Sequence, residues 1–158
     1  MKVVLDESGG ENPAALSLVA EWGWPHLGAS GLNAWLHVRP PFATLYFMLV
    51  GEDEEVLGAA AFEVYDFPDD GSEEVDVAYC CVSDECGRRE LKKLFVGAFA
   101  AVKNSLGDVS AVRGDFDLEE ADFWRRVFPR HPKRVDVILE SRGRQKLFLY
   151  APVEKKTE

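Results

Sequence analysis

Two spacings of apolar residues alternate along the chain, and each predicts a different kind of element. Apolar or alternating runs bounded by turn residues predict seven β-strands, over residues 2–5, 44–50, 56–65, 74–82, 109–112, 134–139 and 146–150. Apolar residues three and four positions apart predict a long helix that ends near Gly107, with Leu91, Leu94, Phe95, Ala98, Phe99 and Val102 on one face. Shorter helices are expected from Pro13 to Gly23, from 30 to 37 and from Asp117 to Val127.

The resulting order is β-α-α-β-β-β-α-β-α-β-β, which is typical of a mixed α+β domain. A long helix between the strands at 74–82 and 109–112 predicts that these two strands are parallel neighbours. We find no linker and no internal repeat, so residues 1–152 are expected to form one domain, followed by a disordered tail at 153–158.

Charge and composition exclude several classes of protein. The net charge of −10 argues against a nucleic-acid binder, because phosphate contacts need basic residues. No apolar run is long enough for a membrane span, and the first residues do not resemble a targeting signal. Three cysteines, two of them adjacent on a predicted strand, do not form a disulfide framework, so we expect a cytoplasmic protein.

The charge is divided unevenly between the two halves of the chain. Residues 1–86 hold 2 Lys/Arg and 17 Asp/Glu, whereas residues 87–158 hold 16 and 11. An anionic ligand would therefore prefer the second half. There, a predicted strand ending at Val82 meets the long helix through a loop that contains Gly87, and a helix start attracts anions. Arg88, Arg89 and two lysines lie beside it and either bind a phosphate or face solvent.

This junction and the element order resemble the GNAT superfamily of acetyl-CoA-dependent N-acetyltransferases. The family's commonest junction, Arg-Gly-Arg-Gly-hydrophobic-Gly-x-x-Leu, falls on Cys86-Gly87-Arg88-Arg89-Glu90-Leu91-Lys92-Lys93-Leu94. The second, third and last positions match, whereas the two later glycines are replaced. Downstream, Asp117 stands at the family's Asn, and Trp124 stands where many members have a tyrosine that protonates the leaving thiolate.

The resemblance implies a GNAT-like mixed sheet of about seven strands and a binding site for acetyl-CoA, without a metal. The residues that it places at the cofactor are Cys81, Val82, Cys86, Gly87, Arg88, Arg89, Glu90, Leu91, Asp117 and Trp124. It also implies that Trp24 and His26, in the segment between the first two helices, line the acceptor pocket. The three histidines are scattered without metal-ligand spacing, which agrees with the absence of a metal.

Three residues of the strand at 74–82 are candidates for proton transfer. Glu74 and Asp76 share one face and either accept the proton of the acceptor amine or simply face solvent. An indole cannot protonate a thiolate, so Tyr79 replaces Trp124 as the candidate acid, unless it only packs in the sheet. Cys80 and Cys81 are expected to pack as small apolar residues rather than act as nucleophiles.

Three functions stay open at this point. The first is an N-acetyltransferase that acts on an amine, a small molecule or a protein, and the acidic first half favours a cationic acceptor. The second is a binding or regulatory module that keeps the GNAT fold and has lost catalysis, as the replaced glycines suggest. The third is a protein–protein interaction module that uses the acidic segments 52–55 and 66–76. A homodimer is compatible with all three.

Overall fold

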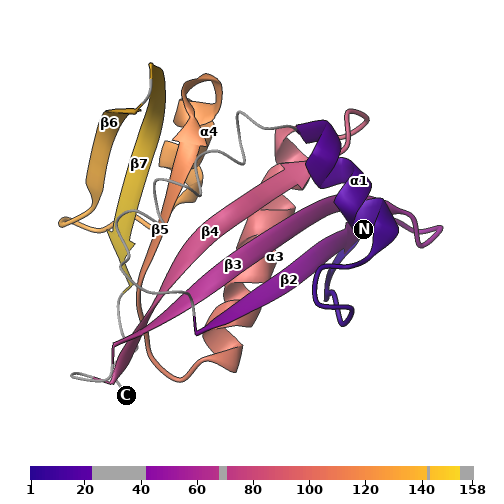
Figure 1. Ribbon diagram of the computed structural model, residues 1–158, viewed down its shortest axis with the longest axis horizontal. Coiled ribbons are helices and arrows are strands. Elements are labelled where there is room, and N and C mark those ends of the chain that lie inside the picture. The colour runs from indigo at the N-terminus through magenta and orange to yellow at the C-terminus, as the bar shows by residue number, and fades with distance from the viewer. Residues whose placement is uncertain (23–41, 68–70, 142, 154–158) are drawn as a thin grey trace.

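The computed structural model describes residues 1–22, 42–67, 71–141 and 143–153. In this part of the chain, one mixed sheet has the strand order β1-β2-β3-β4-β5-β7-β6 (Figure 1). The strands are β1 (Lys2–Leu5), β2 (Ala43–Val50), β3 (Val56–Phe67), β4 (Ser72–Val82), β5 (Val109–Asp117), β6 (Val135–Ser141) and β7 (Arg144–Pro152). Only β4 and β5 pair in parallel among these strands, so the predicted parallel pair is confirmed.

The helices cover both faces of the sheet. One face carries α3 (Arg88–Ser105) and α4 (Ala121–Val127), and the other carries α1 (Pro13–Trp22) (Figure 1). The predicted element order and α+β class are therefore confirmed where the chain is described. The helix expected at 30–37, Trp24, His26 and most of the predicted tail lie outside the described residues.

The main core lies between the sheet and α3. The six apolar residues whose spacing predicted this helix are all buried against the sheet. Phe62 of β3 lies 6.1 Å from Phe95 and 6.4 Å from Phe99, measured between ring centroids. A smaller cluster on the opposite face joins α1 to Ala59 and Cys81. The two adjacent cysteines lie on opposite faces of the sheet, since Cys80 packs in the α3 core and Cys81 packs on the α1 side.

The first helix starts where its sequence predicts. Oδ1 of Asn12 accepts hydrogen bonds from the backbone N–H of Ala14 at 3.0 Å and of Ala15 at 3.2 Å. This side-chain cap satisfies two amides that the helix leaves without a backbone partner, and Pro13 occupies the first helical position.

The predicted bounds of β5 and α4 need correction. The strand expected at 109–112 continues to Asp117, because β7 pairs with it as far as Asp117 opposite Lys146. Arg113 and Asp115, which follow the expected strand, are buried within the sheet. Consequently, the helix expected to start after Asp117 begins with a short 3₁₀ turn over Leu118–Glu120, and α4 proper starts at Ala121.

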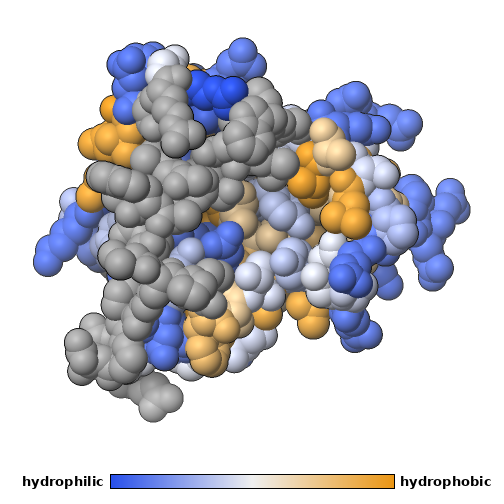
Figure 2. All heavy atoms as spheres, viewed as in Figure 1, coloured by the Kyte–Doolittle hydropathy of each residue, from blue (hydrophilic) through white to orange (hydrophobic). Residues whose placement is uncertain are grey.

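Hydrophilic and apolar residues both gather in patches on the visible surface. Figure 2 shows hydrophilic residues at the edge where the β2–β3 loop lies, and an apolar area over α1, where Leu16 is half exposed. None of the described helices is both long enough and apolar enough to cross a membrane.

Candidate active site

The strands β4 and β5 run side by side for only part of their length. Their last residue pair is Val77 with Gly114, yet β4 continues to Val82 and β5 to Asp117. Beyond that pair the two strands diverge, and no other described strand pairs with this side of β4. The sheet is thus open at the end where α3 begins.

A bulge marks the same position in β4. Its pairing with β3 moves from Val77 opposite Phe62 directly to Tyr79 opposite Ala61, so Ala78 is the extra residue. This extra residue changes which side chains of β4 face each side of the sheet. Val77 and Cys80 both pack against the α3 core, whereas Tyr79 packs on the α1 side.

Two backbone amides of β4 point toward the opening. The N–H of Ser83 donates to the carbonyl oxygen of Leu57 at 2.8 Å. Because alternate residues of an antiparallel pair bond to the partner strand, the amides of Cys80 and Val82 point away from β3, toward the side that β5 has left. Amides in this position can donate to a developing oxyanion.

The start of α3 carries its own anion. The N–H of Gly87 donates to Oε2 of Glu90 at 2.9 Å, and this bond lowers the pKa of the Glu90 carboxyl. A carboxylate thus already holds the amide that the family resemblance assigns to a phosphate. Arg88 and Arg89 are exposed on the first turn, and the charge of Arg88 lowers the pKa of Glu120 against the larger, upward effect of burial.

A hollow of about 370 Å³ lies between α1 and the end of β4. Its walls are formed by Leu18, Glu21 and Trp22 of α1 together with Val82 and Asp84. Val82, a predicted cofactor residue, thus lines a cavity beside the open end of the sheet, and Trp22 forms part of the opposite wall.

The two predicted proton acceptors are both held by Arg113 of β5. Its Nε donates to Oδ1 of Asp76, and its Nη2 lies 3.2 Å from Oε1 of Glu74. The hydroxyl of Tyr150 also donates to Oε2 of Glu74, at 2.9 Å. Burial raises the pKa of Asp76 to about 7, against the opposing effect of the guanidinium.

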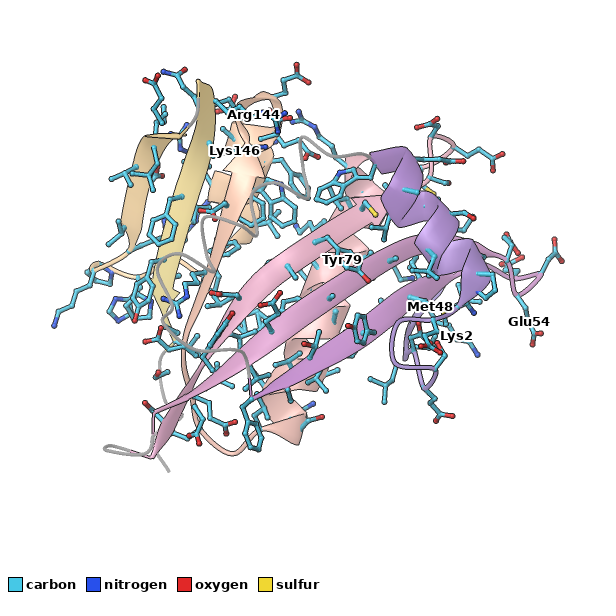
Figure 3. The ribbon with its side chains drawn as sticks, viewed as in Figure 1. Lys2, Met48, Glu54, Tyr79, Arg144 and Lys146 are labelled. Carbon is cyan, nitrogen blue, oxygen red and sulfur yellow. The ribbon has the colours of Figure 1, made fainter. Side chains whose placement is uncertain are left out.

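Tyr79 projects on the face that α1 covers, as does Met48 from β2 (Figure 3). Burial raises the pKa of its phenol well above the usual value. The phenol is therefore neutral across the physiological pH range, but it gives up its proton less readily than a phenol in water.

Trp124 and Leu91, both predicted at the cofactor, have side chains in the core. The Trp124 indole is 1% exposed and stacks on Phe116, with ring centroids 4.1 Å apart. Its buried Nε1 lacks a hydrogen bond of normal geometry, and its interaction with the nearby Glu120 carboxyl only opposes the larger effect of burial, which raises the pKa of Glu120. Leu91 is 5% exposed and packs beneath the first turn of α3.

The structure adds two residues that sequence reasoning missed. Asp115 and Lys146 are 6% and 9% exposed, on neighbouring strands β5 and β7. A sequence signal for Asp115 lies in the polar residues at 113, 115 and 117, whose alternation continues the period of a strand. Within the described ranges, no group of three His, Cys, Asp or Glu residues is arranged to hold a metal ion.

The chain is similar over nearly its whole length to several solved structures. A protein from Klebsiella pneumoniae assigned to the acyl-CoA N-acyltransferases gives a TM-score of 0.59 at 13% identity, covering 96% of each chain. FeeM, an N-acyl amino acid synthase from uncultured soil microbes, gives 0.58 at 10% identity, covering 95% of this chain and 94% of that one. NAA60 from Arabidopsis thaliana, solved with a bisubstrate analogue, gives 0.56 at 11%, covering 96% and 97%.

The sequence itself matches no known family profile and no curated protein. The comparison therefore rests on structural similarity at 10–13% identity, and similarity of this kind shows a shared fold alone. The mixed seven-stranded sheet with helices on both faces agrees with it. The chain has the fold seen in GNAT acyl-CoA N-acyltransferases.

Proposed function

We propose that the protein is an acyl-CoA-dependent N-acyltransferase that moves an acetyl group to an amine. The observation that carries this proposal is the opening between β4 and β5, with the amides of Cys80 and Val82 directed into it. This arrangement can hold an extended ligand between the strands and stabilise negative charge on a carbonyl oxygen beside β4.

In this reaction the amine nitrogen attacks a thioester carbonyl, and the C–S bond breaks to give an amide and a free thiol. A thioester supplies the electrophilic carbon and the thiolate leaving group. The amides of Cys80 and Val82 donate to the oxygen that becomes negative during the attack. A proton must leave the amine, and Glu74 or Asp76 receives it, directly or through water; a proton must also reach the thiolate, and Tyr79 donates it.

The residues around the start of α3 fit a phosphate only in part. Arg88 and Arg89 are exposed there and supply two positive charges. The carboxylate of Glu90 opposes them, because it occupies the amide of Gly87. We therefore expect Arg88 and Arg89 to contribute most of the attraction for the phosphates of coenzyme A. The backbone amides should contribute less than they would in a loop with the family's glycines.

The first experiment is isothermal titration of the purified protein with acetyl-CoA and with free coenzyme A. Micromolar binding of both ligands supports the proposal. Turnover is then measured as thiol release in the presence of primary amines, with no amine as the control. Failure of both ligands to bind at millimolar concentration would refute the proposed cofactor site.

A second candidate function is a module that binds acyl-CoA without transferring the acyl group. The observation that favours it is the burial of Trp124 where the family resemblance places a proton donor. Binding of acetyl-CoA without thiol release for any amine would support this second function over catalysis.

A further inference from the structure

Asp115 is a buried carboxylate without a hydrogen-bond donor. Its residue is 6% exposed, and neither Oδ1 nor Oδ2 has a hydrogen-bond partner in the described part of the chain. An ionised carboxylate carries about four acceptor sites and is costly to bury when they are empty. A ligand or a solvent molecule that donates to it would remove this cost.

The neighbouring cations do not fill this need. The pKa of Asp115 is raised to about 7, mainly by burial and also by the charge of Asp76, against the lowering effects of Lys146 and Arg113. The guanidinium of Arg113 is directed at Asp76 and Glu74 instead. Lys146 acts on Asp115 through its charge, and neither oxygen of Asp115 accepts a hydrogen bond from it.

Asp115 also lies beside the opening between β4 and β5. It is the first residue of β5 beyond Gly114, at the point where β5 leaves β4. It shares a face with Arg113, which is the face that α1 covers and that is opposite to α3. Figure 3 shows the two flanks of this position, with Lys146 on β7 to one side of β5 and Tyr79 on β4 to the other.

The charge of the surroundings selects the kind of ligand. Asp115, Asp76 and Glu74 supply three carboxylates, against the two cations Arg113 and Lys146. An ammonium group brings one positive charge and three N–H donors, which suits two empty carboxylate oxygens better than a neutral donor does.

We infer that the carboxylate of Asp115 binds the ammonium group of the acceptor amine beside the opening between β4 and β5. The inference rests on the proposed function for the nature of the acceptor, and it adds the residue that recognises it. An ammonium at Asp115 stands on the β5 side of the opening, facing the amides of Cys80 and Val82 on β4.

The test uses n-butylammonium as the probe and n-butanol as a neutral control of the same length, observed by NMR of the whole protein. We expect butylammonium to shift the β5 resonances around Asp115 and to lower the apparent pKa of its carboxyl, and butanol to do neither. Because this measurement uses the wild-type protein, it does not depend on the folding of a variant. An unchanged pKa in the presence of butylammonium would overturn the inference.

Two matched variants complete the design. Asp115→Asn keeps the size of the side chain and removes its charge, so it should weaken butylammonium binding at least tenfold. Asp53→Asn removes one charge from the exposed β2–β3 loop and should bind the probe like the wild type. Undiminished binding to Asp115→Asn would also overturn the inference.

Titration of the same samples with acetyl-CoA distinguishes this inference from the proposed function. Acetyl-CoA binding to both variants, with butylammonium binding lost only in Asp115→Asn, supports both. Loss of probe binding without any binding of acetyl-CoA supports the ammonium site and refutes the cofactor site. If acetyl-CoA binds and butylammonium binds Asp115→Asn as tightly as the wild type, the ammonium site alone is refuted.

Discussion

Gly114 sits at the point where β5 leaves β4, and a methyl group there is expected to disrupt the core beneath the opening. A Cβ at this position would lie 2.5 Å from Cζ and 2.9 Å from Cε2 of Phe116. These distances are shorter than carbon atoms tolerate, so the ring must move. Its movement is restricted, because the ring stacks on Trp124 at 4.1 Å and meets Phe128 edge-on at 5.4 Å.

We therefore expect Gly114→Ala to lower the free energy of unfolding by about 1–3 kcal/mol, the usual cost of overpacking a core. Displacement of the stacked ring adds to that cost, since an aromatic pair contributes about 0.5–1.5 kcal/mol beyond the area it buries. Equilibrium unfolding in urea measures the change, and an unchanged slope against urea concentration shows that the two end states are the same.

Gly107→Ala is the matched control. Gly107 is exposed after the end of α3, and a Cβ there meets no atom within 4 Å. Its substitution should change the free energy of unfolding by no more than about 0.5 kcal/mol. If Gly114→Ala proves as stable as Gly107→Ala, the packing of Phe116 against Trp124 does not restrict this position and the reasoning is wrong.

Three further predictions concern the proposed cofactor site and Asp115. Gly87→Asp places a second carboxylate beside Glu90, whose Oε2 lies 3.7 Å from the new Cβ. It should weaken acetyl-CoA binding strongly in a calorimetric titration. Unchanged affinity would exclude this loop from the site. Arg88→Ala combined with Arg89→Ala should raise the Kd roughly three- to tenfold and flatten its salt dependence, whereas normal binding would show that both arginines only face solvent. The pKa of Asp115 is raised from 3.8 to about 7 in the folded state. Between these two pH values the folded protein therefore holds a proton that the unfolded chain has lost. The free energy of unfolding should fall as the pH rises through this range. Asp115→Asn should remove on the order of 2 kcal/mol of that fall between pH 5 and 8, and parallel curves of unfolding free energy against pH for variant and wild type would contradict this.

The sequence predicted elements best where local chemistry and burial agree. The long helix and its buried face were correct because six apolar residues at helical spacing pack against one sheet. The first helix was correct because Asn12 and Pro13 act within a single turn. The parallel pair followed from the length of the crossover alone.

The errors arose where distant residues determine local structure. The expected strand ended at Val112, before Arg113, because a buried Arg113 is stable only with Asp76 and Glu74, which lie far away in the sequence. The same long-range pairing hides Asp115 and Lys146, whose burial depends on β7 lying beside β5. The bulge at Ala78 likewise has no local signal, since it appears only when β4 is aligned with β3.

The carboxylate that Glu90 places on the amide of Gly87 has a consequence for how folding and ligand binding are linked. The first turn of α3 has its amide of Gly87 bonded to a carboxylate of the same helix, so α3 can form without a bound anion. A phosphate that binds the amide of Gly87 must first displace the carboxylate of Glu90, and this displacement lowers the net free energy of binding. If the proposed function is correct, saturating coenzyme A should raise the melting temperature only modestly, and the complex should exchange quickly.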